Sequence, residues 1–452
     1  MTMSHGVLQD YLNQVKQLVS QNKSIAKVMS INVGMNPQMI ANLQNELNSN
    51  QVNIRNTLEN FFLFKDGKQK SERFAFTQLV ETYLVFIRDF NPYSIVESID
   101  LILNYLNSLI VVFNNYDDMS NSLIGCLMSD LDFGYKVCKI VDKVLWQQGI
   151  NRNYPILTKL SIYLSKLFND CKKNQTRNPI KKSILLKISN YMLMIYFVID
   201  QPLNCATIFI TNRHNFKTLR GSDFGKADVI KYRYYLGKFL ILNDLYRPAL
   251  IQFTYCYSKY PITHMRSQNF ENILELLIVM LLSNGYHPQS QLIMKFQNPK
   301  LRNLYSSLVY AVKSGNVKEV NRIIDTSMDY LRHKGLYNLL LRNLTILTYR
   351  NLFYQTFKIL NNGNVIENYT ATLQYSSFLV GLKVSEDSYA SKTVEEQLQH
   401  VEEILVSLID KKWIKGVIFP GSSRIALSKK GNAFSPPLTN VNPRNEYDWL
   451  DK

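Results

Sequence analysis

The residue types that most often perform catalysis or bind metals are scattered in this sequence. No two histidines have the HExxH spacing of a zinc enzyme, and no glycine-rich phosphate loop, GxGxxG segment or serine elbow is present. No two cysteines form a CxxC pair, so neither a zinc site nor a disulfide framework is indicated. We therefore expect a protein that is not an enzyme, has no metal or cofactor, and occupies a reducing compartment. The dispersed residues are His5, His214, His264, His287, His333, His400, Cys126, Cys138, Cys171, Cys205 and Cys256.

Basic side chains, in contrast, gather near the C-terminus. Residues 411–430 contain six Lys or Arg and no Asp or Glu. Positive charges at this density are suited to phosphates, which they contact without distinguishing bases. The pattern predicts nucleic-acid binding, with a merely solvated basic face as the alternative. The predicted contact residues are Lys411, Lys412, Lys415, Arg424, Lys429 and Lys430.

A second basic stretch precedes this one. Residues 295–350 hold ten Lys or Arg against three Asp or Glu, and the whole chain of 452 residues carries a formal charge of +17. Such an excess favours an anionic partner, either nucleic acid or an acidic protein. Arg350 is expected to be a buried hydrogen-bonding residue. As partner-interface residues we predict Lys313, Lys318, Arg322 and Trp413.

The elements that position these residues are predicted to be mainly helices. Glycine (17) and proline (13) are scarce for this length, and apolar residues recur at helical spacing. The longest apolar stretches fall short of the roughly 20 residues needed to cross a membrane. In residues 233–261, Leu236-Gly237, Ala249, Phe253 and Pro261 have the tetratricopeptide (TPR) spacing, in which Gly237 permits two helices to approach closely.

Towards the C-terminus the periodicity changes. Ser314-Gly315-Asn316 predicts a helix break, and Thr393 with Glu396 predicts a capping box at the start of the last helix. Two short strands, Trp413 to Phe419 and Arg424 to Ser428, follow with a four-residue loop between them. A helix followed by such a hairpin is typical of a winged helix.

These patterns predict a mostly α fold, a TPR-like helical-repeat solenoid capped by a C-terminal winged helix. We expect a partly ordered helical arm over 1–60 and helical repeats over 61–227. TPR-like helices over 228–370 and a winged helix over 371–432 follow, with an irregular tail over 433–452. The basic break at 172–182 predicts a solvated loop, or alternatively a nuclear-import signal.

Several of these motifs resemble those of PCI-domain proteins, which are subunits of the proteasome lid, the signalosome and a translation initiation complex. The run Ala311-Val312-Lys313-Ser314-Gly315-Asn316-Val317 resembles the PCI signature. Residues 232–238, 347–353 and 408–418 resemble the branch that contains the PCI subunit of the nuclear mRNA-export complex and its signalosome-associated relative. The segment 88–94 favours the export-complex subunit, so a PCI module is expected over 228–432.

The resemblance implies a set of partners. These are a large PCI-like scaffold subunit, paired winged helix to winged helix, a small acidic protein of the proteasome-lid type, and RNA or DNA. It also implies a nuclear location associated with the nuclear pore, with a cytoplasmic pool in addition, and no membrane insertion or small-molecule substrate. The alternative is a signalosome- or proteasome-lid-type scaffold that does not bind nucleic acid.

Overall fold

The computed structural model describes residues 6–32, 37–49, 53–61, 70–91, 93–149, 153–174, 178–215, 224–363, 371–386, 393–429 and 432–434. The chain divides into two compact units, with the boundary between Tyr232 and Arg233. None of the helices in the described ranges is long and apolar enough to cross a membrane.

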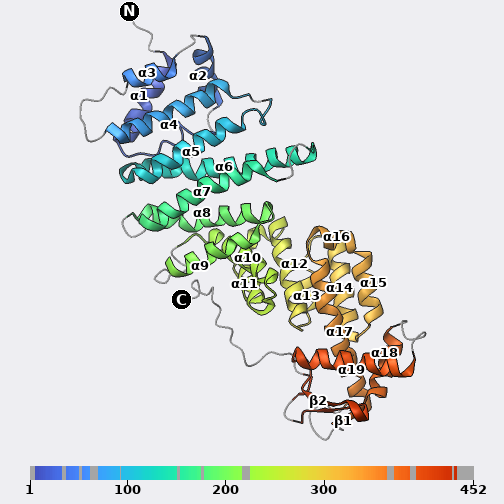
Figure 1. Ribbon diagram of the computed structural model, residues 1–452. Coiled ribbons are helices and arrows are strands. Elements are labelled where there is room, and N and C mark those ends of the chain that lie inside the picture. Colours follow the sequence, from blue (N-terminus) through green and yellow to red (C-terminus); the bar gives the residue numbers. More distant parts are fainter. Residues whose placement is uncertain are drawn as a thin grey trace, which may run out of the picture. The chain divides into compact units, whose positions relative to one another are not determined.

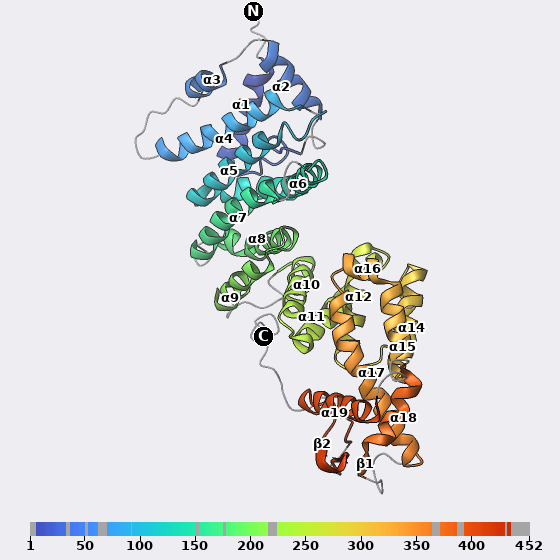
Figure 2. The ribbon, with the colours of Figure 1, turned by 45° about the vertical axis from the view of Figure 1, so that its right-hand side comes forward.

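The first unit is a stack of helices. Successive long helices contact the next one along the chain, from α4 through α8, as expected of a solenoid (Figures 1 and 2). The helices are α1 (Val7–Ser20), α2 (Pro37–Ser49), α3 (Ile54–Phe61), α4 (Lys70–Asp89), α5 (Ile99–Asn115), α6 (Ser120–Gln147), α7 (Pro155–Asn174), α8 (Pro179–Val198), α9 (Cys205–Asn215) and the start of α10 (Lys226–Leu242), with short 3₁₀ turns at Asp117–Met119 and Pro202–Asn204.

The N-terminal segment is joined to this stack by buried polar contacts. Ser30 donates to the carboxylate of Asp130 on α6 at 2.6 Å, and the Tyr105 hydroxyl donates to the Met29 carbonyl at 2.6 Å. Tyr105 also lies 3.0 Å from Asp130. Because these groups are buried, each bond replaces water that the fold has excluded. Residues 29 and 30 are thereby fixed against α5 and α6.

The basic break after α7 contains a lysine with a structural role. Lys181 is fully buried, and its Nζ lies 2.7 Å from a carboxylate oxygen of Asp170 and 2.9 Å from one of Asp117. Burying an ammonium group is costly unless it is paired in this way. Lys181 therefore joins α8 to its neighbours and is not part of an exposed import signal.

The second unit starts with the TPR-like hairpin, and the helical-repeat prediction is confirmed. Phe253 packs so closely on Gly237 that a Cβ there would lie 2.7 Å from its ring. Asp244, with φ of 59°, turns the chain between the two helices. The helices are the end of α10, then α11 (Tyr246–Lys259), α12 (Gln268–Ser283), α13 (Ser290–Ile293), α14 (Pro299–Ser314), α15 (Val317–Thr326), α16 (Met328–His333) and α17 (Tyr337–Leu360), with a 3₁₀ turn at Ile262–His264.

The break inside the PCI-like motif has the expected geometry. Gly315 ends α14 in the left-handed conformation, with φ of 78°, and the Asn316 side chain caps α15 by accepting from the Glu319 amide at 3.0 Å. The amide of Asn351 on α17 donates to the Val312 carbonyl at 2.8 Å. α17 therefore supports the end of α14.

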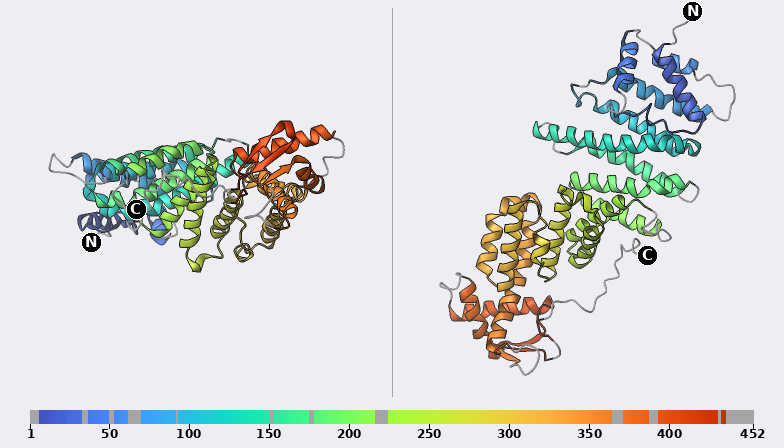
Figure 3. Two further views of the ribbon diagram at one scale, coloured as in Figure 1. Left: turned by 90° about the horizontal axis from the view of Figure 1, so that it is seen from below. Right: turned by 180° about the vertical axis from the view of Figure 1, so that it is seen from behind.

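The last module packs two helices and a three-stranded antiparallel sheet on the end of α17 (Figure 3). Its elements are β1 (Thr372–Gln374), α18 (Tyr375–Ser385), α19 (Val394–Asp410), β2 (Gly416–Phe419), a 3₁₀ turn at Pro420–Ser422 and β3 (Arg424–Leu427). The sheet order is β1-β3-β2. Helix, strand, two helices and a hairpin in this order are typical of a winged helix, and we interpret the module as one.

The sequence motifs predicted the position of this module correctly, except for the start of the first hairpin strand. The capping box at Thr393 is present, with both bonds to Glu396 formed. The first hairpin strand, however, begins at Gly416 and not at Trp413. The Trp413 amide instead donates to the Leu408 carbonyl at 2.8 Å, closing the end of α19.

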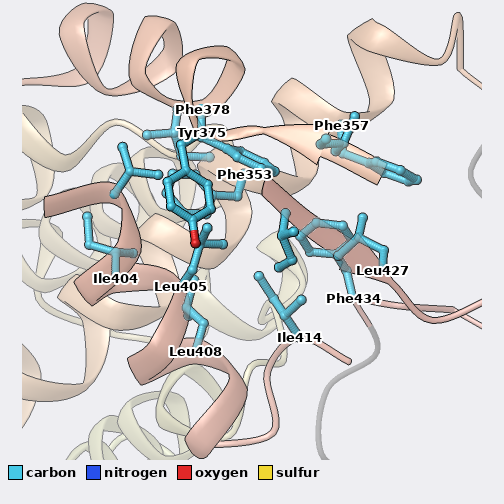
Figure 4. Packing of buried hydrophobic residues seen from close by; sticks show 14 of the residues in the cluster. Phe353, Phe357, Tyr375, Phe378, Ile404, Leu405, Leu408, Ile414, Leu427 and Phe434 are labelled. Atoms are coloured by element: carbon cyan, nitrogen blue, oxygen red, sulfur yellow. The ribbon is translucent and has the colours of Figure 1, made fainter. Parts of the chain in front are cut away.

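Aromatic and aliphatic side chains from α17, α18, α19 and the sheet form one core in this module (Figure 4). The rings of Phe353 and Phe378 pack in a tilted arrangement, with centroids 4.6 Å apart and an interplanar angle of 42°. Phe434, beyond the hairpin, is fully buried and packs on Phe357 at 5.3 Å. The segment after β3 therefore completes the core.

Candidate nucleic-acid interface

The turn after α19 presents two lysines to solvent. Lys411 caps the helix, and Lys412 has a left-handed backbone with φ of 61°. Backbone bonds to Ile409 and Leu408 hold this turn in place. Both lysine side chains are exposed. The hydrogen-bonded turn therefore holds the backbone of both lysines in a defined conformation and leaves their ammonium groups in solvent.

Two further exposed lysines lie at the base of the hairpin. The Lys415 amide donates to the Ala433 carbonyl, and the Lys415 carbonyl accepts from the Ser428 amide, each at 2.8 Å. This pairing brings Lys429 beside Lys415, and both side chains are exposed. We call Lys411, Lys412, Lys415 and Lys429 the basal lysine cluster.

Arg424 does not join this cluster. It opens β3 and pairs in register with Phe419, the last residue of β2, so it lies at the tip of the hairpin. At about 3.3 Å per residue, the length of β2 separates it from Lys415 by roughly 13 Å. Arg424 is exposed and forms a separate positive point. Lys430, also predicted as a contact, lies outside the described residues.

Few neighbouring carboxylates offset these charges. Among the residues that the structure describes, no ion pair involves the basal lysine cluster or Arg424. Lys334 and Arg342 in the preceding basic stretch, in contrast, are paired with Glu275 and Asp244. Much of the charge in residues 295–350 therefore serves the fold, whereas the charge of the cluster faces solvent.

The predicted partner-interface residues lie apart from the hairpin, on α14 and α15, except for Trp413. Arg322 forms a two-pronged pair with Glu319, with bonds of 2.7 and 2.5 Å. Lys313 and Lys318 are exposed on the last turn of α14 and the first turn of α15. Trp413 is half-buried against the core of the last module.

Arg350 takes the structural role expected of it. It donates to the Asn351 side chain at 2.8 Å, and its guanidinium lies 5.3 Å from the centre of the Tyr354 ring. Burial lowers the pKa of Arg350 to about 10. Arg350 is thus half-buried, and its guanidinium also lies over the Phe434 ring of the last module.

A pocket beside Lys411 was not anticipated from the sequence. It has a volume of about 390 Å³ and is formed by segments at 246–251, 283–286, 343–346 and 411–413. Trp413 and Lys411 line it together. Because its walls come from four distant stretches of the chain, no local pattern marks it.

The charge at the edge of this pocket is set by Asp244. Hydrogen bonds from Arg342 and Tyr246 lower the pKa of the Asp244 carboxyl, and Lys411 contributes at longer range. The Tyr246 hydroxyl donates to this carboxylate at 2.5 Å. Asp244 therefore stays ionised at neutral pH and fixes the Tyr246 ring.

Chemically, the arrangement is suited to binding anionic groups. Exposed ammonium groups on a rigid turn and hairpin can hold phosphates in register without reading base sequence. Within the described ranges, the His, Cys, Asp and Glu side chains form no group of three that is able to hold a metal ion.

The fold and site together define a helical-repeat protein with a basic, winged-helix-like module at its C-terminal end. No family profile matches the chain. It is 25% identical to "Nuclear mRNA export protein THP1" of Saccharomyces cerevisiae, over 92% of this chain and 93% of that protein. These similarities support a relationship to the PCI-domain proteins, in their THP1-type branch.

Two further relatives support this assignment over shorter regions. The "PCI domain-containing protein 2 homolog" of Dictyostelium discoideum is 28% identical over 58% of this chain and 56% of its own length. The "Protein CSN12 homolog" of Schizosaccharomyces pombe is also 28% identical, over 53% of each chain.

Proposed function

We propose that this chain is a non-catalytic PCI subunit of a nuclear, transcription-coupled mRNA-export complex. The similarity to the yeast export protein extends over nearly the full length of both chains, which supports a shared overall role. The chain pairs with a scaffold subunit and a small acidic protein and acts at the nuclear pore. The formal charge of +17 is complementary to such an acidic partner.

The module at the C-terminus contacts RNA or DNA through phosphates. The observation that carries this part is the basal lysine cluster, whose four exposed ammonium groups form no ion pair within the described residues. Each neutralised phosphate releases condensed counterions, so binding is salt-dependent.

The test measures the affinity of the purified full chain for a single-stranded RNA across a range of salt concentrations. Lys412→Glu combined with Lys415→Glu is expected to weaken binding and to reduce the slope of log affinity against log salt by about 1 to 2 units. The matched control is Lys358→Glu with Lys383→Glu, which makes the same charge change at exposed lysines elsewhere in the unit. An equal loss in both variants would mean that only net charge matters.

A second candidate function is a scaffold of the signalosome type that does not bind nucleic acid. The similarity to the CSN12 homologue favours it. Isolation of native complexes on the tagged chain separates the two functions, because export factors are expected with the first and signalosome subunits with the second. An RNA affinity that is absent at every salt concentration would also favour the scaffold.

A further inference from the structure

We propose that the pocket lined by Trp413 and Lys411 binds an unpaired nucleobase, so that this chain prefers single-stranded over duplex nucleic acid. The proposal rests on the proposed function and extends it from phosphates to a base. Its physical basis is one cavity that combines fixed aromatic rings, hydrogen-bonding side chains and an adjoining cluster of cations.

Two aromatic rings in the pocket are held before any ligand arrives. Trp413 follows the left-handed turn at Lys412, its amide is bonded to Leu408, and its indole is half-buried. Tyr246 lines the same pocket, and its hydroxyl is bonded to Asp244 and Arg342. Rings fixed in this way lose little conformational entropy when a base stacks on them.

The pocket is also chemically mixed. Part of its wall is apolar and is formed by Leu250, Ile251 and Ile346. The hydroxyl and amide groups of the wall come from Ser283, Asn284 and Asn343. Its volume of about 390 Å³ leaves room for a planar heterocycle together with water. A base edge offers donors and acceptors to the polar groups.

An apolar peptide side chain would displace water from those groups without replacing its hydrogen bonds, which is unfavourable. The mixed lining therefore favours a nucleobase over an apolar peptide anchor.

The lysines beside the pocket are placed to contact the phosphates that flank a bound base. Lys411 lines the pocket, and Lys412 and Lys415 follow within four residues on the same turn and hairpin base. A base in the pocket places its flanking phosphates near these ammonium groups. Because a paired base is stacked inside its duplex, only an unpaired base can enter.

The experiment compares a single-stranded oligouridylate with an RNA duplex on the full chain. Trp413→Leu, which keeps an apolar side chain but removes the stacking surface, is expected to lower single-strand affinity on the order of 10-fold. Duplex affinity and the salt slope are expected to stay unchanged. Trp413→Phe should recover part of the loss, and Trp146→Phe, at an exposed site in the first unit, is the control.

Fluorescence gives a readout that does not depend on affinity differences between variants. The chain has three tryptophans, so Trp146→Phe with Trp449→Phe leaves Trp413 as the only reporter. Single-stranded RNA should quench its emission, and the duplex should not. Thermal unfolding of each variant checks that the fold is retained.

The outcomes distinguish this proposal from the one on which it rests. If Trp413→Leu leaves single-strand binding intact while Lys412→Glu with Lys415→Glu weakens it, the base pocket is wrong and the phosphate platform stands. If no variant binds differently and the salt slope is flat, the proposed function fails as well. If an acidic peptide quenches Trp413 and the oligonucleotide does not, the pocket is a protein site.

Discussion

The backbone of Leu352 on α17 lies against Gly315, so closely that a Cβ on Gly315 would come within 2.6 Å of the Leu352 Cα. Gly315 also has a positive φ of 78°, and its carbonyl accepts from the Ser385 hydroxyl at 2.9 Å. One glycine thus joins the α14–α15 break to α17 and α18.

Replacing Gly315 is therefore expected to destabilise the second unit. Gly315→Ala adds the cost of a left-handed alanine, about 1 kcal/mol, to overpacking against backbone atoms, about 1 to 3 kcal/mol. Gly335→Ala is the matched control, because Gly335 has a φ of 71° but no atom within 4 Å of its Cβ position. Urea unfolding should show a clearly larger loss for Gly315→Ala, and equal losses would refute the close contact.

The stability of the first unit should depend on pH through Asp130. Burial raises the pKa of Asp130 to about 6, above its unfolded value near 3.9. As pH rises between these values, the unfolded chain releases its proton first, so stability falls. The difference corresponds to about 3 kcal/mol. Asp130→Asn should therefore flatten the pH dependence of the unfolding midpoint between about pH 4 and pH 6.

Asp132, on the same helix, provides a control of opposite sign. Burial opposes its ionisation, but the hydrogen bond and charge of Lys136 outweigh burial and lower the pKa of Asp132. A lowered pKa gives stability that is lost on acidification, so Asp132→Asn should remove a loss at low pH. If the two variants respond alike, the assignment to Asp130 is wrong.

Glu275 is expected to be essential for packing among α12, α14 and α16. It is buried and accepts from the hydroxyls of Tyr305 at 2.9 Å and Tyr330 at 2.6 Å, with Lys334 at 3.5 Å. Glu275→Leu leaves the buried Tyr305 hydroxyl without this acceptor and should cost about 2 to 4 kcal/mol in unfolding free energy. Glu275→Gln keeps an acceptor and should cost less, so similar losses would contradict this role.

Phe434 should stabilise the last module and, through it, the basal lysine cluster. Phe434→Ala removes a fully buried ring and should cost about 3 to 5 kcal/mol. Because the neighbouring Ala433 carbonyl accepts from the Lys415 amide, RNA affinity should fall as well. Phe419→Ala, at the half-exposed hairpin tip, is the control and should change stability little.

Features encoded in a few adjacent residues could be predicted from the sequence. Gly315, the capping box at Thr393 and the hairpin from β2 to β3 each have local chemistry that fixes the backbone. The strand β1 could not be predicted, because its three residues show no periodicity and form a strand only by pairing with β3.

In the candidate site, too, locally encoded features could be predicted and features that depend on tertiary structure could not. The run of lysines after Asp410 is visible in the sequence, but the separation of Arg424 from the basal lysine cluster depends on hairpin register. The pocket could not be predicted from the sequence, because tertiary packing alone brings Tyr246 and Trp413 into one lining. Phe434 was missed since an irregular segment carries no periodic signal of burial.

The position of β3 in the sheet has a consequence for synthesis. Of the three strands in the described sheet, β3 is the last to be synthesised, yet it lies between β1 and β2, which pair with it and not with each other. The described sheet therefore cannot assemble until residues 424–427 have been synthesised, and the sheet's part of the core stays unformed until then. A premature stop before Arg424 would remove the shared partner of both other strands and leave a hydrophobic surface for chaperones or proteases.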